Sequence, residues 1–410
     1  MSISARIFAP RNSSDIITTA QLAERLAAMG GTSTTGMTVN AESAMRQVTV
    51  LACVVVLAQS LAQLPCNLME TKETGKVKAY DRRLYSLLHD APNEFQTAYH
   101  FWQTNMAKVA LHGNAYAYKV MVGNEVRELL PIPHGNIEKV EQDHNYKLWY
   151  TVRFARQGGT TYTETIPQEN IFHLRGLSLN GYTGLNPIAY ARESIGLAQA
   201  AERFGGKMYS NGAKISGVLT HPGRLSPAAE KNLRTSFEEK HSSIENAFKT
   251  MILEEGVKFT PGAMNAQDAQ FLDNRKFQRT EICALFRVPP HMVADLERAT
   301  FSNIEQQDLG FVKHTMAPYL VNFEQEIKQQ LIAQQDRLRL FAKFNANALL
   351  RGDFKSRMEG YGIGIQNSIT APNEARDLED MPPYPGGEKH QMQQNMTFVS
   401  EGGTPNADSK

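Results

Sequence analysis

Residues 31–38 (GTSTTGMT) are the stretch of this sequence that comes nearest to nucleotide chemistry. They have the glycine spacing of a phosphate-binding loop, which wraps backbone N–H groups around the phosphates of ATP. Such a loop needs a lysine directly after its second glycine to reach the terminal phosphates, but this position holds Met37. No apolar strand precedes the segment. We therefore expect a flexible linker here and no ATP site.

Metal and acid–base chemistry find equally little support in the spacing of the reactive residues. The chain has 11 histidines, but none forms the His-x-x-x-His pair that places two ligands on one helix face. No Gly-x-Ser-x-Gly motif marks a nucleophilic serine. Asp and Glu are numerous, so the fold decides whether two of them meet as an acid–base pair. We predict no catalytic residue, no metal site and no cofactor.

Three cysteines, Cys53, Cys66 and Cys283, are odd in number and lack metal-binding spacing. This pattern predicts free thiols, buried as small apolar side chains in a reducing compartment. The most hydrophobic run covers residues 50–58, which is much shorter than the roughly 20 residues of a membrane-spanning helix. We expect a soluble chain that does not enter a membrane.

The charges of the chain are balanced, with 43 Lys and Arg residues against 42 Asp and Glu residues. A protein that grips DNA by neutralising phosphates usually carries a basic patch or stripe. The balance argues against tight, sequence-independent DNA binding, although it leaves room for a local ring of basic residues.

A helix, a proline loop and a long helix follow one another between residues 265 and 333. The first helix is predicted over 268–288 and ends at Pro289-Pro290, because these two residues lack backbone donors. Its apolar residues are expected near one face: Phe271, Phe277, Ile282, Leu285 and Phe286. In the loop that follows, His291 is expected to be exposed to solvent. The loop is too long for an ordinary helix connector.

The second helix is predicted to begin near Ser302 or Asn303, since either can cap it. Pro318 lies in its interior, so we expect a kink there. One apolar stripe runs along it at helical spacing: Leu309, Val312, Met316, Tyr319 or Leu320, Phe323, Ile327 and Leu331.

The rest of the chain mixes helices with antiparallel strands, which predicts an α+β fold. One helix is expected over 41–64, short helices over 82–89 and 97–111, and a long helix from Pro187 to about Ser210. Strands are predicted over 66–70, 115–122, 126–131, 137–141, 147–155, 160–166, 171–174, 215–220, 250–253 and 338–344, the last returning to the first domain. Short helices are expected over 353–360 and 371–379.

Nine short motifs together resemble the portal proteins of long-tailed, double-stranded-DNA bacteriophages. In chain order they are 111–116 (LHGNAY), 184–188 (GLNPI), 211–214 (NGAK), 287–293 (RVPPHMV), 299–303 (ATFSN), 305–307 (EQQ), 309–311 (LGF), 350–353 (LRGD) and 381–387 (MPPYPGG). The resemblance covers roughly residues 41–387 in order. It implies a portal-type fold with an α/β wing, a two-helix stem, a small α/β clip, a long kinked helix and a helical crown.

The resemblance also implies boundaries for these parts. They are a flexible N-terminal tail (1–40), wing (41–184), stem helix (185–212), clip (213–262), stem helix (263–288), tunnel loop (289–303), long kinked helix (304–335), wing return strand (336–352), crown (353–385) and disordered C-terminal tail (386–410).

Two groups of residues take functional roles by this resemblance. The tunnel loop, which faces DNA in the channel, would contribute Leu296, Glu297, Arg298, Ala299, Thr300, Phe301 and Ser302. The clip, which meets the packaging motor and later the tail adaptor, would contribute Arg224, Glu230, Lys231, Arg234, Glu238, Glu239 and Lys240. Charged side chains suit an interface that must exchange partners.

The implied protein is a non-enzymatic subunit of a ring of about twelve copies at one capsid vertex, assembled in the host cytoplasm. Its implied partners are its own copies, double-stranded DNA passing through without sequence preference, the terminase large subunit, the head–tail adaptor, and the major capsid and scaffold proteins. A head–tail connector or minor capsid ring protein is the alternative. A packaging ATPase or nuclease ranks lower, because the lysine-bearing phosphate loop is missing.

Overall fold

The computed structural model describes residues 31–73, 75–123, 125–155, 159–210, 217–220, 223, 226–228, 230–231, 235, 258–261, 267–296, 301–346, 354–379 and 381–390. The chain divides between Asn345 and Ala346 into two compact units. Helices and sheets are mixed, and every strand pair among the described residues is antiparallel. The mixed α+β class is therefore confirmed.

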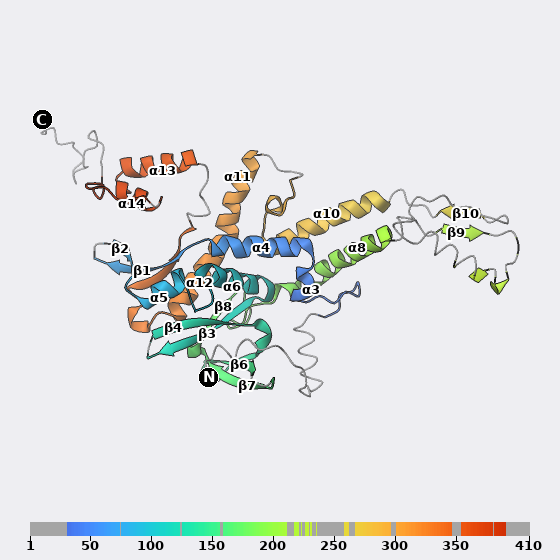
Figure 1. Cartoon of the computed structure of the whole chain (residues 1–410), viewed down its shortest axis with the longest axis horizontal. Coiled ribbons are helices and arrows are strands. Elements are labelled where there is room, and N and C mark those ends of the chain that lie inside the picture. Colours follow the sequence, from blue (N-terminus) through green and yellow to red (C-terminus); the bar gives the residue numbers. More distant parts are fainter. Residues whose placement is uncertain are drawn as a thin grey trace. The chain divides into compact units, whose positions relative to one another are not determined.

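The helices of the first unit begin with α3 (Ala41–Met45), α4 (Val48–Ala62), α5 (Arg83–His89) and α6 (Ala98–His112). They continue with α7 (Pro187–Tyr190), α8 (Arg192–Ser210), α10 (Gln267–Phe286), α11 (Phe301–Gly310) and α12 (Ala317–Gln330) (Figure 1). Short turns are η1 (His134–Asn136), η2 (Gln168–Asn170), η4 (Pro290–Val293) and η6 (Gln334–Asp336), and η5 (Phe311–Met316) is a π-helical segment.

The strands of the first unit are β1 (Cys66–Lys72), β2 (Gly75–Lys78), β3 (Asn114–Val122), β4 (Glu125–Ile132), β5 (Ile137–Gln142), β6 (Leu148–Ala155), β7 (Thr161–Pro167), β8 (Ile171–Arg175), β9 (Gly217–Thr220), β10 (Lys258–Pro261) and β11 (Leu340–Phe344). Two three-stranded sheets, in the orders β4-β3-β8 and β5-β6-β7, share one core. Tyr116 and Ile132 of the first sheet pack with Tyr150, Val152 and Phe154 of the second. The hairpin predicted at Gly123, whose φ is 61°, joins β3 to β4.

A third sheet, in the order β11-β1-β2, brings the end of the first unit back to its beginning. Cys66 of β1 lies opposite Phe344 of β11, which confirms the predicted return strand. Trp102 of α6 holds this junction together: its ring lies 5.1 Å from that of Phe344 and 6.5 Å from that of Phe323 in α12. The indole N–H of Trp102 donates to the Leu88 carbonyl at 3.1 Å.

The single helix predicted over 41–64 is wrong, because it divides into α3 and α4. Asn40 caps α3 in a reciprocal pair with Ser43, and the Gln47 side chain accepts from the Val50 N–H at 2.9 Å to begin α4. Capping side chains satisfy the free donors of a new helix start, so the chain turns there at little cost. The predicted helix from Pro187 likewise divides, at Ala191, into α7 and α8.

Residues 31–40 lie against α8, although the sequence predicted a flexible linker there. The Thr34 backbone N–H and hydroxyl both donate to Glu193, at 3.0 and 2.6 Å. The Thr35 hydroxyl donates to the Gly196 carbonyl at 3.2 Å. A Cβ atom on Gly196 would lie 2.4 Å from the Ser33 hydroxyl oxygen, so this glycine admits the segment. Residues 1–30 lie outside the described part of the chain.

Helices α8 and α10 lie side by side, and strands β9 and β10 pair at their far end (Figure 1). Ser194 donates to Glu281 at 2.9 Å near one end of the helix pair, and Glu202 and Arg275 form an ion pair at 3.7 Å further along. The strand predicted over 215–220 is present, but its partner is β10 at 258–261. The strand predicted over 250–253 lies outside the described residues.

The second unit contains α13 (Phe354–Gln366) and α14 (Pro372–Asp377). Glu379 accepts from Arg357 at 2.7 Å and from the Tyr361 hydroxyl at 3.0 Å, which ties the residues directly after α14 to α13. The disordered tail predicted from residue 386 is wrong at its start, because the Asn373 N–H donates to the Gly387 carbonyl at 2.8 Å and Gly387 is buried. Residues 391–410 lie outside the described residues. No helix within the described ranges is long and apolar enough to span a bilayer.

Candidate functional site

Helix α10 ends just before the proline loop in a turn that its own sequence dictates. Arg287 adopts a left-handed conformation with φ of 54°. Its N–H bonds to the Ala284 carbonyl at 3.1 Å, and the Val288 N–H reaches back to the Cys283 carbonyl at 3.0 Å. This is the Schellman pattern of a helix C-terminus. Pro289 follows, and it cannot continue the helix.

The first half of the proline loop is fastened to both neighbouring helices. Asp295 accepts from Arg279 of α10 at 3.3 Å, and its N–H bonds to the Pro290 carbonyl at 3.0 Å. The two ring nitrogens of His291 lie 2.8 Å from Gln307 and 2.8 Å from Asp308 of α11. The His291 side chain is 8% exposed, so the predicted exposure to solvent is wrong. Its partners follow 16 and 17 residues later.

The structure describes only part of the predicted tunnel loop. Leu296 is exposed directly after the fastened half. Phe301 and Ser302 already belong to α11, which begins slightly earlier than the sequence predicted. Glu297, Arg298, Ala299 and Thr300 lie outside the described residues.

The second helix of the prediction is three consecutive segments, α11, η5 and α12. The π-helical segment η5 lies immediately before Pro318, which occupies the first turn of α12. A proline lacks the N–H that would bond to the carbonyl four residues back and collides with it, and a π segment changes the bonding register at that point. The Thr315 hydroxyl in η5 donates to the Arg287 carbonyl at 2.7 Å, which ties η5 to the end of α10.

Most predicted apolar positions with a described side chain are shielded from water, and one position on each helix is exposed. Met316, Leu320, Phe323, Ile327 and Leu331 are buried as predicted. Leu309 and Phe277 are exposed instead, and Gln278 takes the buried position next to Phe277.

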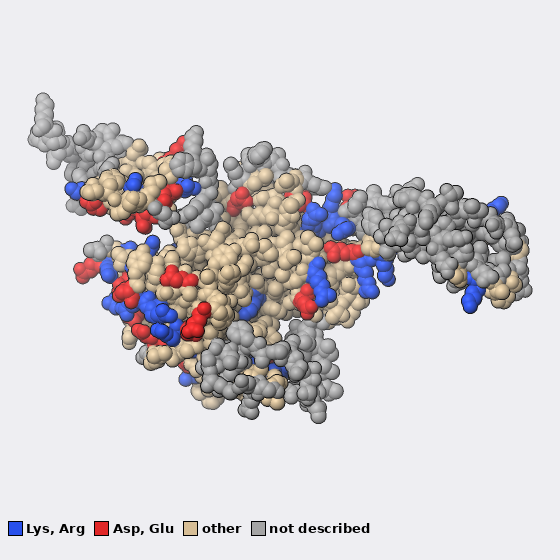
Figure 2. Space-filling view, viewed as in Figure 1, with Lys and Arg blue, Asp and Glu red and all other residues tan. Residues whose placement is uncertain are grey.

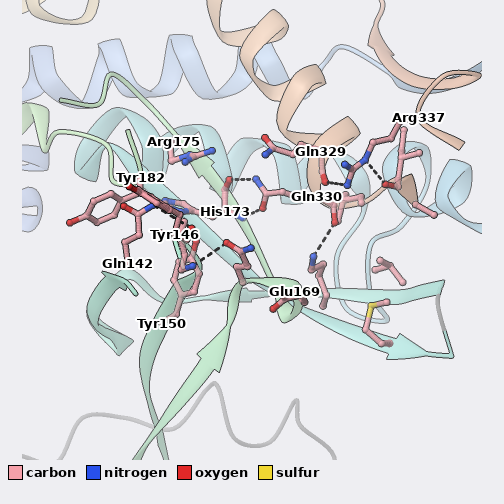
Figure 3. A pocket seen from close by; sticks show the side chains of 18 of the residues that line it. Gln142, Tyr146, Tyr150, Glu169, His173, Arg175, Tyr182, Gln329, Gln330 and Arg337 are labelled. Carbon is pink, nitrogen blue, oxygen red and sulfur yellow. Dashed lines mark hydrogen bonds between the residues drawn. The ribbon is translucent and has the colours of Figure 1, made fainter. Parts of the chain in front are cut away.

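A polar cavity of about 560 Å³ lies where the end of α12 meets the sheets β4-β3-β8 and β5-β6-β7 (Figure 3). The Gln330 side chain accepts a hydrogen bond from the backbone N–H of His173 at 2.7 Å and donates one to the backbone carbonyl of His173 at 2.8 Å. Lys119 donates to the Gln330 carbonyl at 2.9 Å, and Arg337 donates to the Gln329 and Ile332 carbonyls. These cations bond the carbonyls at the C-terminus of α12, where the helix dipole favours positive charge.

The buried polar groups behind this cavity form a closed chain of hydrogen bonds. His173 Nε2 lies 2.9 Å from the Asn114 side-chain oxygen, which can only accept, so Nε2 carries the proton. The Tyr150 hydroxyl then donates to His173 Nδ1 at 3.1 Å. Burial lowers the pKa of His173 well below its usual value, which keeps the ring neutral.

Arg175 and Glu326 form an ion pair at the same junction, with N–O distances of 2.6 and 3.0 Å. The groups lining the cavity therefore bind one another and fasten α12 to the sheets. This junction was not predicted from the sequence, although Glu326 and Gln330 lie one turn apart as a polar pair beside the apolar stripe of the predicted helix. Within the described ranges, no three His, Cys, Asp or Glu residues are placed to hold a metal ion.

The predicted clip residues are mostly outside the part of the chain that the structure describes. Glu230 and Lys231 are described and exposed. Arg224, Arg234, Glu238, Glu239 and Lys240 are not described.

Comparisons with known proteins agree with the arrangement of these elements. The family model described as phage portal protein matches residues 48–380. The chain is 33% identical to the portal protein of Enterobacteria phage HK97 over 89% of this chain and 86% of that protein. It is 31% identical to the probable portal protein of Streptomyces phage phiC31, over 91% and 83% of the two chains.

A solved structure gives the same fold. The neck of an empty gene transfer agent particle, computed with C6 symmetry, matches with a TM-score of 0.56 at 21% identity, over 88% of this chain and all of that one. The family match spans α4, both sheets, the α8–α10 pair, the proline loop, α12 and α14. From this match and from the relative in HK97, the chain belongs to the phage portal protein family.

Proposed function

We propose that this chain is one subunit of a ring of about twelve copies at a capsid vertex, through which double-stranded DNA is packaged and ejected. The observation that carries the proposal is the family match over residues 48–380, in which the proline loop lies between two helices fastened to the same core. The sixfold symmetry of the related particle neck fits a ring whose copy number is a multiple of six.

The proposed parts follow from the elements. Residues 41–184 and 336–352 form the wing, since β11 completes the sheet that β1 begins. The α8–α10 pair forms the stem, and the β9–β10 end forms the clip. Segments α11, η5 and α12 form the long kinked helix proposed over 304–335, although α12 itself ends at Gln330, and η5 lies at the place of the kink. Residues 353–385 of the second unit form the crown.

Each proposed partner is assigned to one of these parts of the chain. The clip meets the terminase large subunit and afterwards the head–tail adaptor, because its exposed Glu230 and Lys231 suit reversible contacts. The wing meets the major capsid and scaffold proteins during assembly in the host cytoplasm. DNA passes the tunnel loop without sequence-specific contacts, in keeping with 43 basic against 42 acidic residues.

Purified protein should form rings with a central hole in negative-stain images, and should not hydrolyse ATP. Ring images separate the portal and connector functions from a packaging motor or nuclease. Heads assembled without this protein should contain no DNA, whereas heads that lack only a connector should fill and then leak. Monomers at all concentrations, or DNA-filled heads without the protein, would contradict the proposal.

Replacing Arg298 with alanine should leave rings intact but reduce the DNA that heads package or retain. Arg298 is the cation that the loop offers to passing phosphates, and one exposed contact per subunit is weak in salt water. DNA content per head, measured after nuclease treatment, tests the effect. Arg127→Ala, at an exposed position of β4, is the matched control. Full heads from both Arg298→Ala and a Gly-Ser replacement of 297–301 would show the tunnel assignment to be wrong.

A further inference from the structure

Helix α4 contains no charged residue on any of its faces. Its inner face, which includes Val50, Val54, Leu57 and Leu61, is buried in the first unit. A surface helix normally presents a charged or strongly polar face to water, whereas the polar residues of α4 are limited to Thr49, Gln59 and Ser60. The sequence of α4 therefore predicts that its outer face is also buried against another protein surface.

Within the described residues of the first unit, the outer face of α4 is nevertheless exposed. Val48, Leu51 and Val55 lie at helical spacing and are 70%, 42% and 37% exposed. Figure 2 shows uncharged surface at the position of α4 on the face drawn. Segment η5 contacts α4, and Leu309, in the α11 turn just before η5, is also exposed. The apolar part of this face ends at Gln59, which lies one turn after Val55 and is also exposed. A group of exposed apolar side chains of this kind marks an interaction site.

We infer that the outer face of α4 is covered by a neighbouring copy of this chain. The inference rests on the proposed ring and identifies one of its contact surfaces. Contacts around a ring are heterologous, so each copy must offer two different surfaces, one to each neighbour. The α8–α10 pair also exposes large apolar side chains, Leu197 and Phe277, and we assign the opposing surface to this pair.

The place of this surface brings the contact close to the tunnel loop. Helix α4 packs against η4 and η5, the segments on either side of the loop that contains Arg298. A neighbour seated on α4 would therefore contact the helix against which both of these segments pack.

Val48→Asp tests the inference with little risk to the subunit fold. Residue 48 is the first residue of α4, where a negative charge favours the helix dipole. The same charge buried under a neighbour would be unpaired. We expect a shift from rings to monomers, seen as a rise of at least about tenfold in the midpoint concentration of assembly. Circular dichroism and the melting temperature of the monomer should be unchanged.

Two further arms complete the experiment. Val122→Asp, at an exposed position at the end of β3, is the matched control and should assemble normally. A photocrosslinking residue at position 51 should give a band of twice the subunit mass, with the crosslinked peptide in α8 or α10. The inference would be overturned if Val48→Asp protein assembled into rings at the wild-type concentration. It would also be overturned if position 51 crosslinked only within its own chain, or only to residues 1–30. Wild-type protein that never forms rings would instead overturn the proposed function.

Discussion

Replacing Glu326 with alanine is expected to lower the free energy of unfolding by about 3–5 kcal/mol, because it leaves a largely buried guanidinium without its counter-charge. Glu326 accepts two hydrogen bonds from Arg175, and its other oxygen accepts from Gln330. The side chains of Arg175 and Glu326 are mostly shielded from water. Urea unfolding of the wild type and the variant, followed by tryptophan fluorescence, measures the difference.

A double-mutant cycle with Arg175→Met separates the ion pair from the rest of α12. Removing both charges should cost less than the sum of the two single changes, since no unpaired charge then remains. Glu326→Gln is the shape-matched control and should be intermediate, because its amide oxygen can still accept. If Glu326→Ala lowers the free energy of unfolding by less than about 1 kcal/mol, the Arg175–Glu326 pair behaves as an ordinary surface ion pair, which would contradict the described junction.

The protein is expected to lose stability steeply between pH 6.5 and acid pH, and His112 should be a main cause. Burial, followed by the neighbouring His134 and Lys108, lowers the pKa of His112 from 6.5 to about 3. The C-terminus of α6 would favour a protonated ring, but burial outweighs it. The unfolded chain binds the proton first, so the stabilising effect is complete above pH 6.5 and is lost as the pH falls toward 3.

Each such group contributes a slope of up to about 1.4 kcal/mol per pH unit within that window. His173, whose pKa burial also lowers, adds to the slope in the same direction. His112→Phe keeps a flat ring against His134, whose ring centroid is 3.9 Å away, and removes the titration. Melting temperatures between pH 7 and pH 4.5 should fall less steeply for the variant. Parallel curves would show that His112 does not cause the acid sensitivity.

Local signals in the sequence predicted most strands and helix ends, because their causes are local. Gly113 ends α6 in a left-handed conformation with φ of 74°, and its neighbour in space, the Leu185 carbonyl, would lie 1.8 Å from an added Cβ. The hairpin at Gly123 and the stop at Pro289 have equally local reasons. Even the return strand was visible as an apolar run, although its pairing with β1 was a choice among several edges.

The errors have non-local reasons. His291 appears exposed in sequence because nothing shows that Gln307 and Asp308 turn back to meet it. Phe277 and Leu309 looked like core residues because apolar periodicity does not say which chain provides the cover. Burial by a second copy and burial within one chain leave the same pattern. The polar pair Glu326 and Gln330 is visible in the sequence, but its partners His173, Arg175 and Lys119 come from distant segments that neither spacing nor composition identifies.

The pairing of β1 with β11 means that the sheet containing β1 can be completed only at the end of the synthesis of the first unit. Cys66 of β1 pairs with Phe344 of β11, which is synthesised much later. One edge of β1 therefore stays unpaired in the nascent chain while all the intervening residues are made. Such edges recruit other strands, and contacts across long loops form slowly. Each subunit is therefore most prone to aggregate before its last strand is synthesised. A chain truncated before residue 340 would keep the open edge and would draw full-length chains into aggregates.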